Sequence, residues 1–323
     1  LRASFGIWEP PKRTRITTRT TITSGPSKKP ANMRAGYHPY RFGPRRGHWQ
    51  SGIVLECVIN VSEGCDARRL ADLDQVCGRD LLDRHSDCDH HRSVFTLVGE
   101  VAGRELTTRC VDTLRLDDHR GVHPRLGVVD VVPFVPLDGS SLDDARRARD
   151  DFARWAAAEL ELPVFVYGPA DKGERQLPDV RRDAWTRLAP DFGPHRPHPT
   201  AGAICAGFRR VLVAYNVWLD DTSVDMARVV ARDVRGDGVR ALGLAVGTRM
   251  QVSMNLIDPH RVGPLEAFER VESVAQSHGV TVAHGELVGL IPGAILERVP
   301  EAKWKRLDLD ESRTIEARRS ARD

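Results

Sequence analysis

The stretch Asp117–Pro136 reads D-D-H-R-G-V-H-P-R-L-G-V-V-D-V-V-P-F-V-P, and it joins a polar loop directly to an apolar run. The run Gly127–Val135 is rich in β-branched residues, so it predicts a strand buried inside a sheet. Gly121 and Pro124 break any helix, and the histidines of the loop are therefore not a helical pair of ligands. A loop histidine is most often a surface group, but one held at the mouth of a buried strand is well placed for proton transfer.

The segments around this strand repeat one order of elements twice. The first unit is predicted as a strand over 54–61, a helix over 66–76 that Asp66 caps, strands over 81–83 and 93–98, a helix over 103–116 and the strand over 127–135. A helix over 142–160 and a strand over 163–167 follow it. The second unit is predicted as a strand over 211–219, a helix over 223–234, strands over 241–246 and 251–257, a helix over 265–278 and a strand over 281–284. Both units read β-α-β-β-α-β, so we expect an α+β protein with two ferredoxin-like subdomains and a ligand groove between them.

Charge divides the chain unevenly. Of the net charge of +3, residues 1–50 contribute +10 from eleven Lys/Arg and one acid, so the remaining residues carry −7. We expect residues 1–52 to be a disordered basic leader and the natural protein to start near Val54. Subdomains over 53–168 and 169–300 and a charged tail over 301–323 complete the expected division. Since the excess of positive charge belongs to the leader, the charge gives no reason to expect a nucleic-acid partner.

Cysteine spacing and hydropathy indicate the compartment. The six cysteines show no C-x-x-C pair, which favours reduced thiols in the cytoplasm. No apolar run approaches the roughly 20 residues that a membrane span needs, so we expect no membrane partner.

Three polar clusters compete for the functional site. The first is the loop that carries His119 and His123. The second, His85–Arg92, contains several metal-ligand residue types, but its adjacent residues cannot all face one ion; a solvated turn, a loop that lines the substrate and a metal site stay open. The third, Asp191–Ala203, is stiffened by prolines and suits either an anionic or heteroaromatic ligand or a rigid linker. No glycine-rich dinucleotide loop, P-loop or G-x-S-x-G elbow is present.

Seven motifs resemble one family in their order along the chain. They are Glu56–Gly64, the L-D pair with His91–Gly99, His119–Pro136, Pro190–Pro194, Ala214–Leu219, Gln251–Asp258 and Glu286–Pro292. Together they resemble the formiminotransferase domain of glutamate formimidoyltransferases over about residues 54–300.

The resemblance implies two ferredoxin-like subdomains and transfer of a formimino group from N-formimino-L-glutamate to tetrahydrofolate, a co-substrate, in histidine degradation. This reaction gives 5-formiminotetrahydrofolate and L-glutamate, and the family pairs as homodimers. It makes His123 the catalytic histidine, a general base and acid. It also implies two folate-binding stretches: Gly193, Pro194, His195, Arg196, Pro197, His198, Pro199, Thr200, Ala201 and Gly202, then Gly238, Val239, Arg240, Ala241, Leu242 and Gly243.

Guanidinium groups bind carboxylates in a bidentate manner, so we expect Arg92 and Arg125 to hold the glutamate carboxylates, with surface ion pairs as the alternative. No metal is expected. The sequence departs from the vertebrate pattern at Thr200-Ala201, at Arg235–Arg240 and at His85, where the family has an acid. Two alternatives therefore stay open: another folate one-carbon reaction, such as handling of 5-formyltetrahydrofolate, and a non-catalytic folate-binding homologue.

Overall fold

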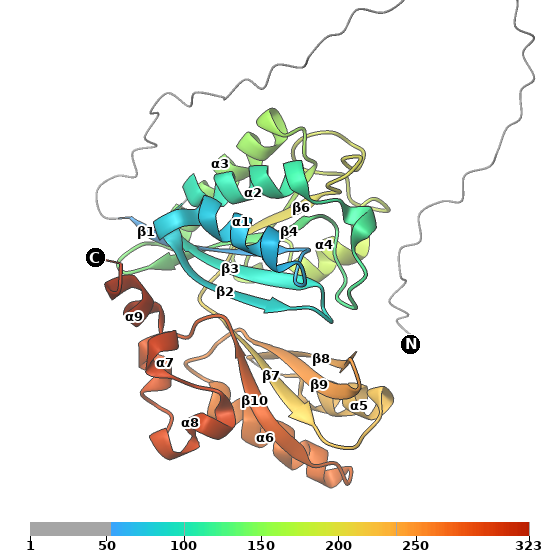
Figure 1. Ribbon diagram of the computed structural model, residues 1–323, viewed down its shortest axis with the longest axis vertical. Helices are drawn as coiled ribbons and strands as arrows, with labels where there is room; N and C mark the ends of the chain where they lie inside the picture. The colour runs from blue at the N-terminus through green and yellow to red at the C-terminus, as the bar shows by residue number, and fades with distance from the viewer. Residues whose placement is uncertain (1–52, 100, 237, 323) are drawn as a thin grey trace, which may run out of the picture. The chain divides into compact units, whose positions relative to one another are not determined.

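The structure is a computed structural model, and it describes residues 53–99, 101–236 and 238–322. The expected leader, 1–52, lies outside these residues. Within them the strands form two sheets, one with the order β2-β3-β1-β4-β6-β5 and one with the order β10-β7-β9-β8 (Figure 1). The two sheets correspond to the two predicted units, so the expected fold class is confirmed.

The first unit follows the predicted order of elements. It consists of β1 (Val54–Val61), α1 (Ala67–Cys77), β2 (Leu81–Asp87), β3 (Arg92–Val98), α2 (Val101–Thr113) and β4 (Val129–Leu137). Strand β1 lies antiparallel between β3 and β4, and β2 pairs with the outer side of β3. The side chain of Asp66 accepts hydrogen bonds from two backbone N–H groups of α1, as the cap prediction requires. Helices α1 and α2 pack on each other over one face of this sheet (Figure 1).

An extension widens the first sheet. It consists of α3 (Leu142–Glu159), β5 (Val164–Tyr167), α4 (Leu177–Asp183) and β6 (Ile204–Phe208). Strand β6 inserts in parallel between β4 and β5, so it belongs to the first sheet although it follows residue 168, where we expected the second subdomain to begin. Neither α4 nor β6 was predicted. All five residues of β6 are buried, and a short strand buried on both faces shows no alternation that a sequence pattern could reveal.

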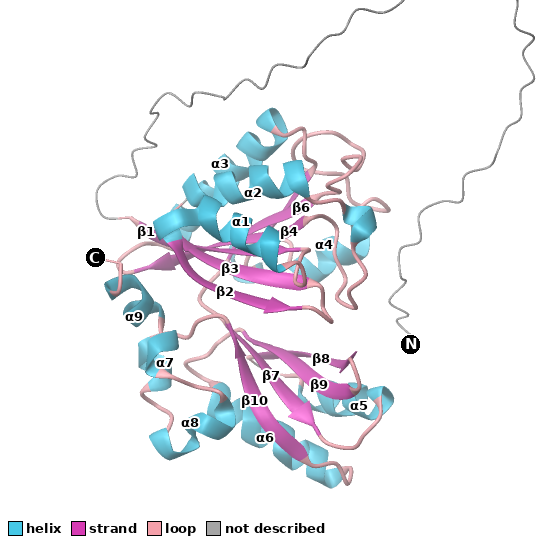
Figure 2. Cartoon of the chain, in the orientation of Figure 1, coloured by secondary structure: helices cyan, strands magenta, loops and turns pink. Residues whose placement is uncertain are grey.

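The second unit repeats the arrangement. It consists of β7 (Val213–Leu219), α5 (Val224–Val234), β8 (Val239–Val246), β9 (Arg249–Leu256), α6 (Pro264–Ser277) and β10 (Val282–Val288). Helices α5 and α6 cover one face of this sheet, where Tyr215, Val217, Val230 and Val271 are fully buried (Figure 2). The other face carries polar side chains, which include Asn216 and Gln251.

Helix α7 (Gly293–Leu296) follows the second unit, and the segment 301–323, expected to be a charged tail, contains α8 (Glu301–Leu307) and α9 (Ile315–Ser320). Leu307, Leu309 and Ile315 are buried, so this segment packs against the body. Among the described residues, no helix combines the length and the apolar character that a membrane crossing requires.

The cysteines depart from expectation. Cys65 and Cys88 form a disulfide, so the prediction of reduced thiols is wrong for this pair. The two residues are 23 positions apart and meet only because the turn before α1 lies against the turn between β2 and β3. The spacing of the cysteines along the sequence does not predict such a contact.

Candidate functional site

The His123 loop lies between α2 and β4 and is fixed by its backbone. At Gly121 a Cβ atom would lie 1.9 Å from the carbonyl oxygen of His90, so only glycine fits there. The next residue, Val122, donates its N–H to the carbonyl oxygen of Asp89 at 3.3 Å. The turn between β2 and β3 therefore sets the position of the loop.

Asp130, the second residue of β4, organises the charges of the site. Its carboxylate is fully buried and accepts hydrogen bonds from Arg92 Nη1 at 2.7 Å, from the Leu126 N–H at 2.8 Å and from Arg181 Nη2. Burial alone would raise the pKa of Asp130, but the two guanidinium groups hold this pKa well below its ordinary value. Asp130 is therefore an anion that anchors two cations, one from β3 and one from α4.

The His123 ring lies against this cluster. Its Nδ1 is 2.8 Å from the carbonyl oxygen of Pro124 and 3.2 Å from Arg92 Nη1. The carbonyl oxygen can only accept a hydrogen bond and the guanidinium can only donate one, so Nδ1 can form a hydrogen bond with only one of the two groups at a time. We assign the proton to Nδ1 because the carbonyl is nearer and Arg92 Nη1 already donates to Asp130. The Nε2 atom then keeps a free lone pair, which is what a general base needs.

The pKa of His123 is well below its ordinary value. Burial is the largest cause, and the cations of Arg92 and Arg181 act in the same direction, whereas Asp130 opposes them. His123 is consequently neutral near pH 7.

Arg125 holds the loop rather than projecting away from it. Its Nη1 donates to the carbonyl oxygens of Gly121 and His123, each at 3.2 Å, and its Nη2 lies 3.4 Å from that of His119. The guanidinium therefore clamps three alternate carbonyls of the loop.

A second polar cluster supports the loop from its other side. The buried carboxylate of Glu63 accepts three backbone N–H groups from residues 64–66 and faces His91 Nε2 at 3.2 Å. The His91 ring lies 4.6 Å from that of His119, centre to centre. Burial, with Arg125 nearby, lowers the pKa of His119 to about 4, so this histidine is a neutral support and not an acid.

Comparison with known proteins shows which family the chain is similar to. Residues 54–209 match the family model for the N-terminal subdomain of the formiminotransferase domain, and residues 214–316 match the model for the formiminotransferase domain. The chain is 34% identical over 289 residues to the glutamate formimidoyltransferase of Streptococcus pyogenes, which covers 81% of this chain and 97% of that protein. It is 31% identical over 298 residues to that of Thermoplasma acidophilum, covering 81% and 96%. It is also 34% identical over 272 residues to the formimidoyltransferase-cyclodeaminase of Sus scrofa, of which it spans 50%.

The chain belongs to the formiminotransferase domain family. The resemblance of the sequence motifs is thereby confirmed, and the positions of the motifs in the structure can be compared with the roles that the family implies.

The first implied folate stretch reaches the His123 loop only at its end. Gly202 forms an isolated bridge with Gly127, and Val128 donates its N–H to the carbonyl oxygen of Ala201 at 2.9 Å. His198 Nδ1 accepts the N–H groups of Thr200 and Ala201, which closes the turn. At the beginning of the stretch, a Cβ on Gly193 would meet the Leu162 carbonyl, so this glycine packs against the chain that enters β5. His195 and Arg196 are exposed between these two anchors.

The second implied folate stretch coincides with the beginning of β8, and its residues face two directions. Val239 and Ala241 are buried in the core of the second unit, and Gly243 lies against the backbone of α5. Arg240 and Leu242 are exposed on the opposite face. Arg240 also donates to the side chain of Gln176 at the start of α4.

Several motifs of the formiminotransferase domain converge on Glu286 of β10. Its Oε2 accepts hydrogen bonds from Asn216 Nδ2 at 3.1 Å, Trp218 Nε1 at 3.0 Å and Gln251 Nε2 at 3.1 Å. Its Oε1 faces His85 Nε2 at 3.7 Å, and both side chains are partly exposed. This carboxylate can therefore accept N–H donors of a ligand through its second oxygen.

The metal alternative for His85–Arg92 finds no support in the arrangement of its side chains. His85 faces Glu286, whereas His91 faces Glu63. In the described part of the chain, no three His, Cys, Asp or Glu side chains gather as a metal site would require.

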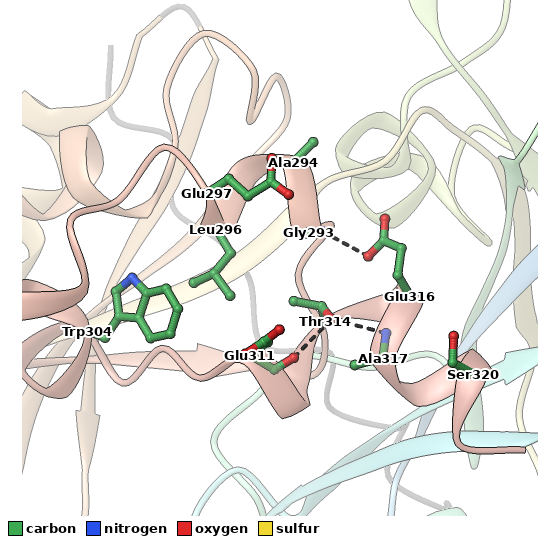
Figure 3. A pocket seen from close by; sticks show the side chains of 10 residues that line it. All are labelled: Gly293, Ala294, Leu296, Glu297, Trp304, Glu311, Thr314, Glu316, Ala317 and Ser320. Carbon is green, nitrogen blue, oxygen red and sulfur yellow. Dashed lines mark hydrogen bonds between the residues drawn. The ribbon is translucent and has the colours of Figure 1, made fainter.

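Two cavities in the described part of the chain are lined by residues other than those of the His123 loop. One, of about 510 Å³, is lined by residues of α7, α8 and α9 and of the turn before α9, among them Trp304, Glu311 and Glu316 (Figure 3). Another is lined by residues that include Val54, Asp138 and Arg319. The ligand groove predicted between the subdomains stays a prediction.

Four residues of the site were not expected from the sequence: Asp130, Arg181, Glu63 and Glu286. Asp130, Glu63 and Glu286 lie inside the motifs that carried the resemblance, so a signal for these three was present. Arg181 had none, because α4 was read as part of a polar linker.

Proposed function

We propose that the protein is a glutamate formimidoyltransferase, which transfers the formimino group of N-formimino-L-glutamate to tetrahydrofolate and releases L-glutamate. The observation that carries the proposal is His123, a neutral histidine with a free Nε2 beside the Asp130 cluster. The names of the relatives from Streptococcus pyogenes and Thermoplasma acidophilum support it.

The reaction needs two proton transfers in sequence. The folate amine attacks the formimino carbon and becomes positively charged, so a base must remove its proton; Nε2 of His123 serves this step. The resulting imidazolium is a strong acid because burial and two cations lower its pKa. It then protonates the departing glutamate nitrogen as the carbon–nitrogen bond breaks. Such general acid–base catalysis contributes about 10²- to 10⁴-fold.

The donor's carboxylates are proposed to bind Arg92 and Arg125. Arg92 uses Nη1 for Asp130 and Nε for Asn60, at 3.2 Å, whereas its Nη2 meets no acceptor among the described residues. Nη2 is thus the atom free for a carboxylate. Arg125 can bind a carboxylate of the donor only if it gives up some of its hydrogen bonds to the carbonyl oxygens of the loop.

Folate is proposed to contact 193–202 and 238–243, through Arg240 and Leu242 in the second stretch. We also propose a cytoplasmic homodimer that acts in histidine degradation and needs no metal. Handling of 5-formyltetrahydrofolate and folate binding without turnover are the alternatives that an assay must separate.

The test measures formiminoglutamate consumption with and without tetrahydrofolate, and with 5-formyltetrahydrofolate as an alternative substrate. The His123→Ala variant should lose about 10²- to 10⁴-fold in kcat while it still binds tetrahydrofolate. His278→Ala is the matched control, because His278 is exposed at the end of α6. Full turnover by His123→Ala would refute the mechanism, and folate binding without turnover by the wild type would refute the enzyme.

A further inference from the structure

The Cys65–Cys88 disulfide joins two turns beside the proposed active site. Cys65 lies in the turn between β1 and α1, and Cys88 lies in the turn between β2 and β3. Both residues are exposed, so a thiol reagent in solution can reach the bond.

The other cysteines of the described residues offer a chemical contrast. Cys57, Cys77, Cys110 and Cys205 are free and buried. Burial raises the pKa of Cys77 and that of Cys205 to about 12, and it raises the pKa values of the other two as well. Because the thiolate is the reactive form, these four thiols are inert in the folded protein. Any reversible thiol chemistry of the native body therefore falls on the Cys65–Cys88 pair.

The disulfide holds the turn that positions the His123 loop. Within the turn, His91 donates its N–H to the carbonyl oxygen of Cys88 at 3.0 Å, and Asp89 accepts the N–H of Val122. On the other side of the bond, Cys65 donates its N–H to Glu63 at 2.8 Å, and Glu63 also faces His91. Breaking the disulfide therefore affects both structures that hold the His123 loop, namely the turn between β2 and β3 and the contacts of Glu63.

We propose that Cys65–Cys88 is a reversible redox site that tunes the transfer reaction, an inference that rests on the proposed function. A dithiol reductant attacks one sulfur, the S–S bond breaks, and a mixed disulfide forms. The second thiol of the reductant then displaces the remaining protein sulfur. The reductant supplies two electrons and two protons and leaves as its own disulfide, and the protein is left with two thiols. Disulfides of cytoplasmic proteins are usually transient catalytic or sensing groups, which fits this exposed bond.

The surrounding contacts accommodate the reduced state. The Cys65 sulfur lies 3.3 Å from the carbonyl oxygen of Cys88, so the thiol formed there has an acceptor. The Asp87 carboxylate accepts the N–H of His90 at 2.8 Å, and because this contact does not involve either sulfur it can keep the turn closed without the disulfide. Reduction therefore loosens the turn without unfolding it. We expect kcat/KM to fall roughly three- to tenfold, since small misplacements of catalytic groups lower rates strongly.

The experiment compares one preparation in two redox states. The native protein is titrated with 5,5′-dithiobis(2-nitrobenzoate) before and after treatment with dithiothreitol and removal of the reductant, and each state is assayed. Two additional thiols should react after reduction, kcat/KM should fall, and oxidised glutathione should reverse both changes. The Cys65→Ser/Cys88→Ser variant should have the activity of the reduced wild type in both states. Circular dichroism checks that this variant is folded.

Each other outcome decides the matter. If the two thiols appear and the activity does not change, the disulfide is only a structural link and the proposal is wrong. If oxidised glutathione does not restore the disulfide, the site is not reversible and the proposal is also wrong. A complete lack of transfer activity in the oxidised wild type would instead count against the proposed function.

Discussion

Replacing Asp130 by asparagine removes the buried charge that two partly buried cations share. Asparagine keeps an oxygen for the Leu126 N–H, but its amide group presents donors to the guanidiniums of Arg92 and Arg181. Asp130 is fully buried, and breaking a buried ion pair by removing one partner costs about 3–5 kcal/mol. We expect Asp130→Asn to lower the free energy of unfolding by about 4 kcal/mol, a large part of the roughly 5–15 kcal/mol that domains have.

The same substitution should also shift the pH dependence of catalysis, and the charges around His123 determine the direction of this shift. Asp130 opposes the cations that lower the pKa of His123, so its removal should lower that pKa further. The acid limb of the pH profile of kcat/KM should therefore move to lower pH. Arg181→Gln removes a cation, and its acid limb should move to higher pH. With Arg92 no longer held at 2.7 Å, kcat/KM of Asp130→Asn should also fall about 10²-fold.

Urea unfolding and tetrahydrofolate-dependent consumption of formiminoglutamate measure the two effects separately. Asp225→Asn is the matched control, because Asp225 pairs with Arg228 at 2.9 Å on the exposed face of α5 and surface pairs contribute little. The double variant Asp130→Asn/Arg181→Gln should recover part of the stability, since it leaves one fewer unpaired cation. Wild-type stability of Asp130→Asn, or an acid limb that moves to higher pH, would refute the reasoning.

Two further predictions concern the loop. Gly121→Ala should lower kcat/KM about 10²-fold, because the new Cβ meets the backbone of His90, whereas Gly236→Ala, which meets nothing within 4 Å, should have little effect in the same assay. Burial lowers the pKa of His119 to about 4 in the folded protein, against about 6.5 in the unfolded chain. The unfolded chain therefore binds more protons between these values, and stability falls as the pH drops through this window. The loss should be about 3 kcal/mol in urea titrations and smaller in His119→Asn; an equal loss in that variant would contradict the assignment.

Periodicity was enough to predict both ferredoxin-like units, because each element of a two-layer fold buries one face. The helix predicted over 142–160 is observed as Leu142–Glu159, and the strand over 54–61 has the bounds of β1. The strand over 81–83 extends to Asp87, since its polar residues gain their structure from pairing with β3 and not from their own apolar character. Strand β6 escaped prediction for the opposite reason, because it is buried on both faces.

The candidate site was only partly predictable, because its charges are paired through space. His123 could be inferred from its motif and its position before a strand. Its environment could not, since Asp130 meets Arg92 from 38 residues away and Arg181 from 51 residues away. Arg125 was assigned to the substrate by its residue type, yet its contacts are with the loop. Residue type indicates which group a side chain can bind, but packing decides which group it meets.

The charge of the cluster links substrate binding to proton transfer. Asp130 carries one negative charge against the positive charges of Arg92 and Arg181, so the group beside His123 has a net charge of +1. Protonation of His123 would bring a second positive charge into a buried site, which explains why the pKa of His123 is low in the protein without substrate. On the proposed function, the donor brings carboxylates to this cluster, and their negative charge favours the imidazolium. His123 should therefore become an effective base only when the anionic donor is bound, so that proton transfer follows correct binding.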